Sequence, residues 1–352
     1  MADFDIKKLL QSVVKHGSSD LHLVAGAEPQ IRMDGALKPV NLPKLEGEDI
    51  EKMCYSLITE KQKQHFEEYD ELDFALFLPG IGRFRANYYR TLGHPAAAFR
   101  IIPIKIPSLD DLGAPEIYKK LVQREKGLIL VTGPTGSGKS TTLAAMINEI
   151  NINEHKHIIT VEDPVEFIHT NKKCVFSHRG VGEDTKSFAA ALKYAMRQDP
   201  DIILIGEMRD KETIEAALTA AETGHLVFGT LHTSSAPGTI NRIIDVFTGD
   251  EQPQIRAMIS TSLVAIIAQA LLPKLGGGRV AASEILVTNH AISNLIREDK
   301  VHQIYSQMQL GQEGTGMQTQ TQALLKFIRD GKINRETAMQ FANKPDEISK
   351  AL

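Results

Sequence analysis

The chain has 352 residues, of which 42% are hydrophobic and 24% are charged. These proportions are typical of a soluble globular protein with enough apolar side chains for two domain cores, and they exclude a fibrous or disordered chain. The formal net charge of −4 provides no general basic surface for nucleic acid, so we expect no nucleic-acid partner.

The cysteine content and the lengths of the apolar segments indicate the cellular compartment in which the protein works. Cys54 and Cys174 lie far apart in the sequence, which argues against a disulfide framework and against a four-ligand zinc site. No secretory signal pattern opens the chain, and no apolar run has the length of a membrane span. We therefore expect a cytoplasmic protein with reduced thiols, held at any membrane by a partner.

The first part of the chain, residues 1–104, predicts a small α+β domain. Alternating segments predict strands at Asp20–Val24, Pro29–Met33, Leu37–Val40, Glu71–Leu78, Arg83–Arg90 and Ala96–Ile102. Asp34-Gly35 is a tight-turn signal, and Glu46–Phe66 has helical spacing. Prolines then break the pattern, so residues 105–126 predict a linker with a helix at Pro115–Gln123.

From residue 127 onward, apolar runs alternate with segments of helical spacing. Strands are expected at Leu128–Val131, His157–Val161, Asp201–Ile205 and Leu226–Gly229, and helices from Lys139, near Thr185–Arg197 and near Lys211–Glu222. This alternation predicts an α/β fold with a mostly parallel sheet covered on both faces. After Ser234 we expect mostly helix, with one strand at Arg279–Val287 and a helical segment over residues 291–352.

A phosphate-binding motif follows the first of these strands. Gly133-Pro-Thr-Gly-Ser-Gly-Lys-Ser140 fits G-x-x-x-x-G-K-[ST] between a strand and a helix. The backbone N–H groups of such a loop and the positive end of the next helix bind phosphate, Lys139 reaches the β- and γ-phosphates, and Ser140 ligates Mg²⁺. The predicted cofactors are ATP and Mg²⁺. The predicted nucleotide-binding residues are Gly133, Pro134, Thr135, Gly136, Ser137, Gly138, Lys139, Ser140 and Thr141.

Carboxylates and histidines follow the neighbouring strands. Glu162 and Glu207 each end an apolar strand, where open α/β sheets bind ligands, so both are candidate catalytic residues and Glu207 is also a candidate Mg²⁺ ligand. Which of them is the general base is left open. His225 and His232 flank another strand, and we expect both at the phosphate edge of the sheet, with His232 facing the γ-phosphate as a catalytic group. A structural role is the alternative for each histidine.

Arg83 and Arg85 share one face of a predicted strand in the first domain. Spacing alone favours a solvated sheet face. The alternative is an arginine supplied in trans to a nucleotide on another subunit.

Four motifs in order resemble those of the type II/IV secretion ATPases. They are Gly133–Ser140 for Walker A, Val161-Glu-Asp-Pro-Val-Glu166 for the Asp box, Gly206-Glu-Met-Arg-Asp210 for Walker B, and Thr223-Gly-His with Leu-His-Thr233 for the His box. Ser18-Ser-Asp-Leu-His22 and Ala291-Ile-Ser-Asn-Leu-Ile-Arg-Glu298 are similar to segments of the type IV pilus retraction branch, the PilT family. Ser293 stands where the AIRNLIRE motif of that branch normally has arginine.

The resemblance implies a homohexameric motor for pilus retraction and twitching motility. It implies a PAS-like domain at 1–104, a linker at 105–126, a RecA-like ATPase domain at 127–290 and a C-terminal helical segment at 291–352. ATP would lie between the domains within reach of Arg83 and Arg85. A pilus platform protein would hold the enzyme at the cytoplasmic face of the inner membrane.

Two alternatives to retraction remain. A pilus-extension or type II secretion ATPase is disfavoured because the chain lacks the paired cysteines typical of assembly ATPases. A nucleotide-gated binding module with little turnover is the alternative outside the motors.

Overall fold

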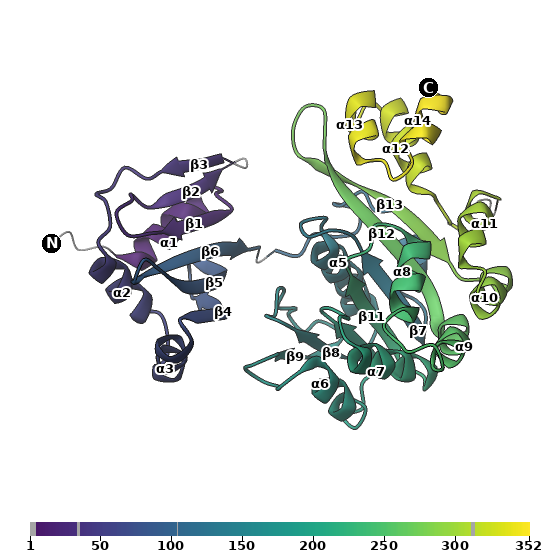
Figure 1. Cartoon of the computed structure of the whole chain (residues 1–352), viewed down its shortest axis with the longest axis horizontal. Coiled ribbons are helices and arrows are strands. Elements are labelled where there is room, and N and C mark those ends of the chain that lie inside the picture. The colour runs from purple at the N-terminus through teal and green to yellow at the C-terminus, as the bar shows by residue number, and fades with distance from the viewer. Residues whose placement is uncertain (1–4, 34–35, 104, 311–313) are drawn as a thin grey trace. The chain divides into compact units, whose positions relative to one another are not determined.

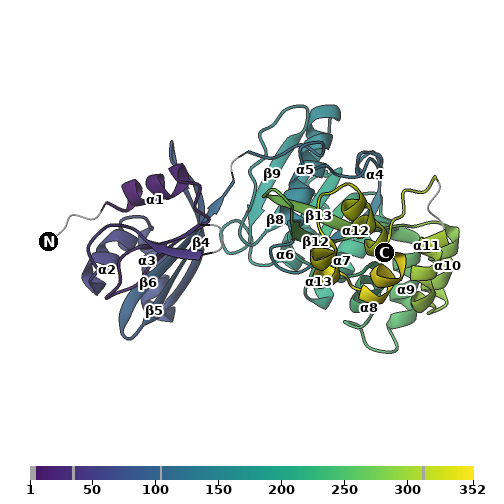
Figure 2. The same ribbon diagram turned by 90° about the horizontal axis from the view of Figure 1, so that it is seen from above.

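The computed structural model describes residues 5–33, 36–103, 105–310 and 314–352. The chain divides into two compact units, residues 1–105 and 106–352, each with its own sheet (Figures 1 and 2). Among the described helices, none combines the length and the apolar character that crossing a membrane requires.

The first unit is an antiparallel sheet with helices packed on it. The sheet has the order β3-β2-β1-β6-β5-β4. Its elements are α1 (Ile6–Lys15), β1 (Asp20–Leu23), β2 (Gln30–Met33), β3 (Ala36–Pro39), α2 (Gly47–Tyr55), α3 (Glu60–Tyr69), β4 (Glu71–Leu78), β5 (Gly82–Thr91) and β6 (His94–Ile102). Buried and exposed residues alternate along β4, so one face of the sheet packs with the helices around Tyr88 and Phe66. The six predicted strands are confirmed, and the turn signal Asp34-Gly35 lies outside the described residues.

The helix predicted over Glu46–Phe66 is two helices instead of one. The first ends at Tyr55, and Thr59 begins the second. The Thr59 hydroxyl accepts from the backbone N–H of Gln62, while the Gln62 side chain accepts from the backbone N–H of Thr59. This reciprocal cap satisfies the free amides of a new helix, and helical spacing on both sides concealed it in the sequence.

The second unit contains a seven-stranded sheet of order β13-β12-β7-β11-β10-β8-β9. The strands are β7 (Gly127–Thr132), β8 (His157–Glu162), β9 (Val175–Gly180), β10 (Ile202–Ile205), β11 (Leu226–Leu231), β12 (Leu263–Pro273) and β13 (Arg279–Val287). Every neighbouring pair is parallel except β12 and β13. The parallel strands therefore all end at one edge, which is where the sequence places its candidate site residues. The predicted α/β fold is confirmed.

Helices cover both faces of this sheet. They are α4 (Ile117–Leu121), α5 (Lys139–Asn153), α6 (Phe188–Ala195), α7 (Lys211–Glu222), α8 (Ala236–Ile244), α9 (Gln252–Ser262), α10 (His290–Arg297), α11 (Ile304–Leu310), α12 (Gln320–Arg329), α13 (Arg335–Phe341) and α14 (Pro345–Ala351), with a 3₁₀ turn at Val301–Gln303. Leu128 and Leu130 of β7 pack with α7 to α10, whereas Ile129 and Val131 pack with α4 and α5. Helices α12 to α14 form a small core of their own against the ends of β12 and β13 (Figure 1).

Two strands were missed by the sequence analysis. Leu263–Pro273, expected to be helical, is β12 and lies between β7 and β13, where both of its faces are buried. Periodicity cannot separate a fully buried strand from a buried helix, so the prediction of helix there was wrong. Val175–Gly180 forms β9 at the edge of the sheet, and its half-buried polar residues gave no apolar signal.

A stack of three aromatic rings lies beside β9. The rings of His169 and Phe176 are parallel within 3° at a centroid separation of 4.8 Å, and His178 stacks on Phe176. His169 is 5% exposed, and its Nδ1 has no hydrogen-bond partner among the described residues. Burial lowers the pKa of His169 to about 3, so the folded chain keeps this ring neutral.

The neutral His169 predicts a loss of stability in mild acid. Its pKa is depressed on folding, so the unfolded chain binds the proton first and stability falls as pH drops below the ordinary value of 6.5. Between pH 7 and pH 5 this group alone should remove about 2 kcal/mol of unfolding free energy.

Urea denaturation at the two pH values measures this effect. His169→Phe keeps the stack and removes the titration, so it should reduce the pH dependence by about that amount. His155→Gln, at an exposed histidine, should leave it unchanged. A pH dependence in His169→Phe equal to that of the wild type would contradict the assignment.

Candidate functional site

The phosphate loop connects a buried central strand to the amino end of α5. β7 is fully buried, and residues 133–138 carry the chain from its end to Lys139. Gly133 has φ +144°, and a Cβ there would lie 2.3 Å from the carbonyl oxygen of Gln269. Gly138 caps α5 with φ +88°, in the left-handed region that glycine adopts without strain. The backbone of the loop can therefore turn its N–H groups toward one point, as an anion cradle requires.

Gln269 holds this loop from the neighbouring strand. This β12 residue is 3% exposed, and its Nε2 donates to the carbonyl oxygen of Ser137 at 2.6 Å. Its Oε1 accepts from the hydroxyl of Thr142 in α5 at 3.0 Å. One side chain thus links the loop to the first turns of the helix. Sequence reasoning missed Gln269 because it missed the strand that carries it.

Lys139 is buried at the start of α5 and turns back over the loop. Its Nζ donates to the carbonyl oxygens of Gly133 at 2.9 Å and Pro134 at 3.2 Å. Burial lowers the pKa of Lys139, and the nearby carboxylates of Glu207 and Glu166 oppose that shift. The ammonium group is held among acceptors that a phosphate can replace.

Glu207 and His232 join Lys139 in one cluster. His232 Nε2 lies 3.0 Å from Glu207 Oε1, and His232 Nδ1 lies 3.5 Å from Lys139 Nζ. Arg209 also contacts Glu207 Oε1. Glu207 follows β10 and His232 follows β11, so adjacent parallel strands bring these groups to the end of β7. The sequence predicted this meeting, and the structure places the three side chains together.

Glu162 occupies the end of β8, the next strand beyond β10. The residue is 9% exposed, and its Oε2 accepts from the backbone N–H of Glu166 at 3.1 Å. A Cβ on Gly206 would lie 3.1 Å from the Cα of Glu162, so the ends of β8 and β10 are in close contact. Glu162 therefore lies at the same edge as Glu207.

The remaining loop residues differ in their exposure. Pro134, Thr135 and Gly136 are exposed, whereas Ser140 and Thr141 are half-buried in the first turn of α5. Ser137 is buried, and its Oγ has no hydrogen-bond partner among the described residues. The exposed tip and the partly accessible first turn leave the loop open to a ligand.

His225 lies at the opposite edge of the sheet. It precedes β11, its Nδ1 lies 3.0 Å from the carbonyl oxygen of Ala220, and its own carbonyl oxygen accepts from the N–H of Gly127 at the start of β7. A strand of six residues, or ~20 Å, separates it from His232. The prediction that both histidines lie at the phosphate edge was wrong for His225, because the two residues that flank one strand lie at opposite edges.

Arg83 and Arg85 lie in the first unit on β5. Arg83 is 7% exposed, and the exposed Arg85 forms an ion pair with Asp73 at 3.6 Å. Their action on a nucleotide in trans stays a prediction.

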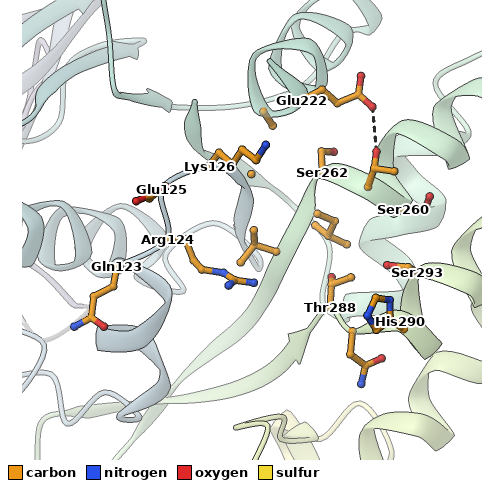
Figure 3. Close-up of a pocket in the computed structure, with 16 residues that line it drawn as sticks. Gln123, Arg124, Glu125, Lys126, Glu222, Ser260, Ser262, Thr288, His290 and Ser293 are labelled. Atoms are coloured by element: carbon orange, nitrogen blue, oxygen red, sulfur yellow. Dashed lines mark hydrogen bonds between the residues drawn. The ribbon is translucent and has the colours of Figure 1, made fainter. Parts of the chain in front are cut away.

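A cavity of about 1030 Å³ lies away from the phosphate loop (Figure 3). Its walls include Gly127 at the start of β7, Glu222 at the end of α7, and Ser293 of α10. It therefore lies at the amino edge of the sheet. Ser293, which departs from the AIRNLIRE pattern, lines this cavity. It is not part of the cluster of Lys139, Glu207 and His232, which we call the nucleotide cluster.

Comparison with known proteins identifies full-length relatives. Residues 3–277 match the family model described as type II/IV secretion system protein. The chain is 51% identical over 344 residues, 98% of its length and 100% of the relative's, to the Pseudomonas aeruginosa protein named "Type IV pilus retractation ATPase PilT". It is 48% identical over 347 residues, 98% of its length and 92% of the relative's, to a "Twitching motility protein" of Neisseria gonorrhoeae.

A solved structure gives the same result. The crystal structure of the pilus retraction motor PilT with bound ADP matches with a TM-score of 0.92 and 50% identity, covering 99% of both chains. The resemblance inferred from the motifs is confirmed.

Removing the two side-chain hydrogen bonds of Gln269 should weaken nucleotide binding. Gln269→Leu keeps the size of the side chain and removes two hydrogen bonds that hold the loop against α5, so the Kd for ADP should rise about tenfold or more. Isothermal titration measures it. Gln318→Leu is the matched control, because that side chain donates to the carbonyl oxygen of Ser283 and not to the loop. Equal affinities for ADP in the two variants would contradict the role of Gln269 in holding the loop.

Proposed function

We propose that this chain, which belongs to the type II/IV secretion system protein family, is an ATP-hydrolysing motor that powers type IV pilus retraction. Two full-length relatives are named for pilus retraction and twitching motility, and the retraction motor of known structure binds ADP. The observation that carries the proposal is the contact of Lys139 and Glu207 with His232 beside the phosphate loop.

The phosphate loop would bind the triphosphate through its backbone. The N–H groups of residues 133–138 and of the first turn of α5 supply donors and the positive end of the helix dipole. Lys139 exchanges its two carbonyl partners for β- and γ-phosphate oxygens. The proposed binding residues are Gly133, Pro134, Thr135, Gly136, Ser137, Gly138, Ser140 and Thr141.

Ser140 and Glu207 would hold Mg²⁺. Arg209 and His232 both contact Oε1 of Glu207, so Oε2 lies outside these two contacts. The described residues form no cluster of three or more acidic, histidine or cysteine side chains suited to a metal. That fits Mg²⁺, which commonly takes one or two protein ligands and completes its shell with phosphate oxygens and water. Bound Mg²⁺ would neutralise charge on the phosphate oxygens.

Glu162 and Glu207 would have different roles in the hydrolysis step. A water oxygen attacks the γ-phosphorus, the bond to the bridging oxygen of ADP breaks, and the proton of the water passes to a carboxylate. We assign that carboxylate to Glu162, because Glu207 is the proposed Mg²⁺ ligand and Glu162 ends the neighbouring strand β8 at the same edge of the sheet. His232 orients Glu207 and faces the γ-phosphate.

The resemblance to the family supports a proposal for the assembly. We propose a homohexamer in which a PAS-like domain (1–104) is joined by a linker (105–126) to a RecA-like domain (127–290) and a C-terminal helical segment (291–352). Arg83 and Arg85 would reach the nucleotide. The partner would be a platform protein of the pilus machinery, which would hold the motor at the cytoplasmic face of the inner membrane.

A strain that lacks this protein separates retraction from its main alternative. A retraction motor removes subunits from the pilus base, so the deletion strain should be hyperpiliated and unable to twitch. Electron microscopy and a subsurface twitching assay measure both traits. A deletion strain without pili would favour an extension ATPase instead.

Lys139→Ala should abolish ATP hydrolysis. The variant removes the cation that meets the β- and γ-phosphates, so kcat should fall by about 100-fold or more. Phosphate release with Mg²⁺ and ATP measures it, and EDTA should remove the wild-type activity. Lys193→Ala, at an exposed lysine of α6, should retain it. Normal turnover in Lys139→Ala would refute the proposed site, and background turnover in the wild type at saturating ATP would favour the nucleotide-gated module.

A further inference from the structure

The orientation of the His232 ring depends on the loop that follows it. The hydrogen bonds of His232 to Lys139 and Glu207 use opposite sides of the imidazole, so both require one orientation of the ring. The loop continues through residues 233–235 to α8, and Ser235 caps that helix by accepting from the N–H of Gly238. The backbone of this loop therefore sets where the imidazole lies.

Glu284 anchors the end of this loop from β13. The side chain is buried in a residue that is 2% exposed, and its Oε1 accepts from the N–H of Ala236, the first residue of α8, at 2.8 Å. The backbone N–H of Gln320, the first residue of α12, hydrogen-bonds the same carboxylate. Burial raises the pKa of Glu284, whereas the two amides and Lys344 oppose that shift. One carboxylate thus lies at the amino ends of two helices, which favour a negative charge.

The C-terminal helices contact the same loop a second time. Asn343, between α13 and α14, donates from Nδ2 to the carbonyl oxygen of Ser234 at 2.8 Å. The backbone N–H of Asn343 donates to Gln320 Oε1 at 2.7 Å, and Gln320 Nε2 donates to the carbonyl oxygen of Phe341 at 3.2 Å. Gln320 therefore fixes the turn that presents Asn343, so the contact with Ser234 comes from a held side chain.

A cavity lies between this loop and the C-terminal helices, beside the hydrogen bonds of Glu284 and Asn343. It measures about 410 Å³, and its walls include Ser234, Glu284, Asn343 and Lys344. The apolar core of α12 to α14 packs instead on β12 and β13. Because close packing does not fill this space, the distance between the loop and the helices is set mainly by the hydrogen bonds of Glu284 and Asn343.

We propose that Glu284 and Asn343 are positioning residues that hold residues 233–236 so that His232 meets Glu207 and Lys139. The same two residues tie this loop to helices α12 to α14, so a movement of the C-terminal helices passes to the nucleotide cluster. The inference rests on the proposed ATPase function. A displacement of about 1 Å in a positioned group can cost on the order of 100-fold in rate, so these contacts matter for turnover.

ATP turnover of two nearly isosteric variants tests the proposal. Glu284→Gln removes the charge and one acceptor, and Asn343→Asp removes the donor to Ser234. Each should lower kcat between about tenfold and 100-fold and change KM for ATP by less than about twofold. The matched control is Asn334→Ala, which loses a 2.8 Å hydrogen bond to the N–H of Thr337 in the same C-terminal segment without contacting the loop. It should retain wild-type kcat.

A double-mutant cycle separates positioning from general stability. In a His232→Gln background, Glu284→Gln should cause no further loss, because its effect passes through the imidazole. An equal loss in both backgrounds would assign Glu284 a structural role and overturn the proposal.

The imidazole signal gives a readout that needs no turnover. In ¹³C-histidine-labelled protein, the Cε1–H signal of His232, assigned by its absence in His232→Gln, should shift in Glu284→Gln and Asn343→Asp but not in Asn334→Ala. An unchanged signal and unchanged kcat would refute the inference. Its failure differs from failure of the ATPase proposal, which Lys139→Ala tests separately.

Discussion

A buried ammonium group at the start of α5 is the constraint around which the site is built. Lys139 is 9% exposed, and a buried cation is costly unless acceptors surround it. The carbonyl oxygens of Gly133 and Pro134 supply two acceptors, and the Glu207 carboxylate contributes opposite charge. The loop, the helix and the ends of two further strands must therefore converge on one point, which is also where a triphosphate would bind.

The parallel sheet makes that convergence possible. β7, β11, β10 and β8 are neighbours in that order, so the residues that follow them lie in sequence along one edge. β12 adds Gln269 from the other side of β7, and β13 adds Glu284 behind the His232 loop. Contacts to the nucleotide cluster thus extend from the middle of the sheet to the C-terminal helices.

The sequence predicted the parts of this site that depend on local pattern. The phosphate loop was recognisable because glycine and lysine spacing sets the backbone and the charge together, and Glu207 and His232 were placed correctly because each follows an apolar strand. His225 failed because a motif that spans one strand does not say which edge each end occupies. Gln269 and Glu284 could not be predicted, since their partners lie more than 30 residues away along the chain, and β12, which carries Gln269, has no periodic signal.

The first unit also contains features that the local sequence pattern predicted and features that it did not. The alternation of β4 gave its strand and its buried face directly, but the reciprocal cap of Thr59 and Gln62 split a helix that spacing alone made continuous. The role proposed for Arg83 and Arg85 involves a nucleotide on a second chain, which neither the sequence pattern nor the fold of one chain predicts.

The most direct test of the central claim is a crystal structure of the oligomer with Mg²⁺ and a non-hydrolysable ATP analogue. The account predicts that Lys139 Nζ leaves the carbonyl oxygens of Gly133 and Pro134 for the phosphates, while His232 and Glu207 stay in contact at the γ-phosphate. An analogue bound away from residues 133–141, with Lys139 still on its two carbonyl partners, would contradict it.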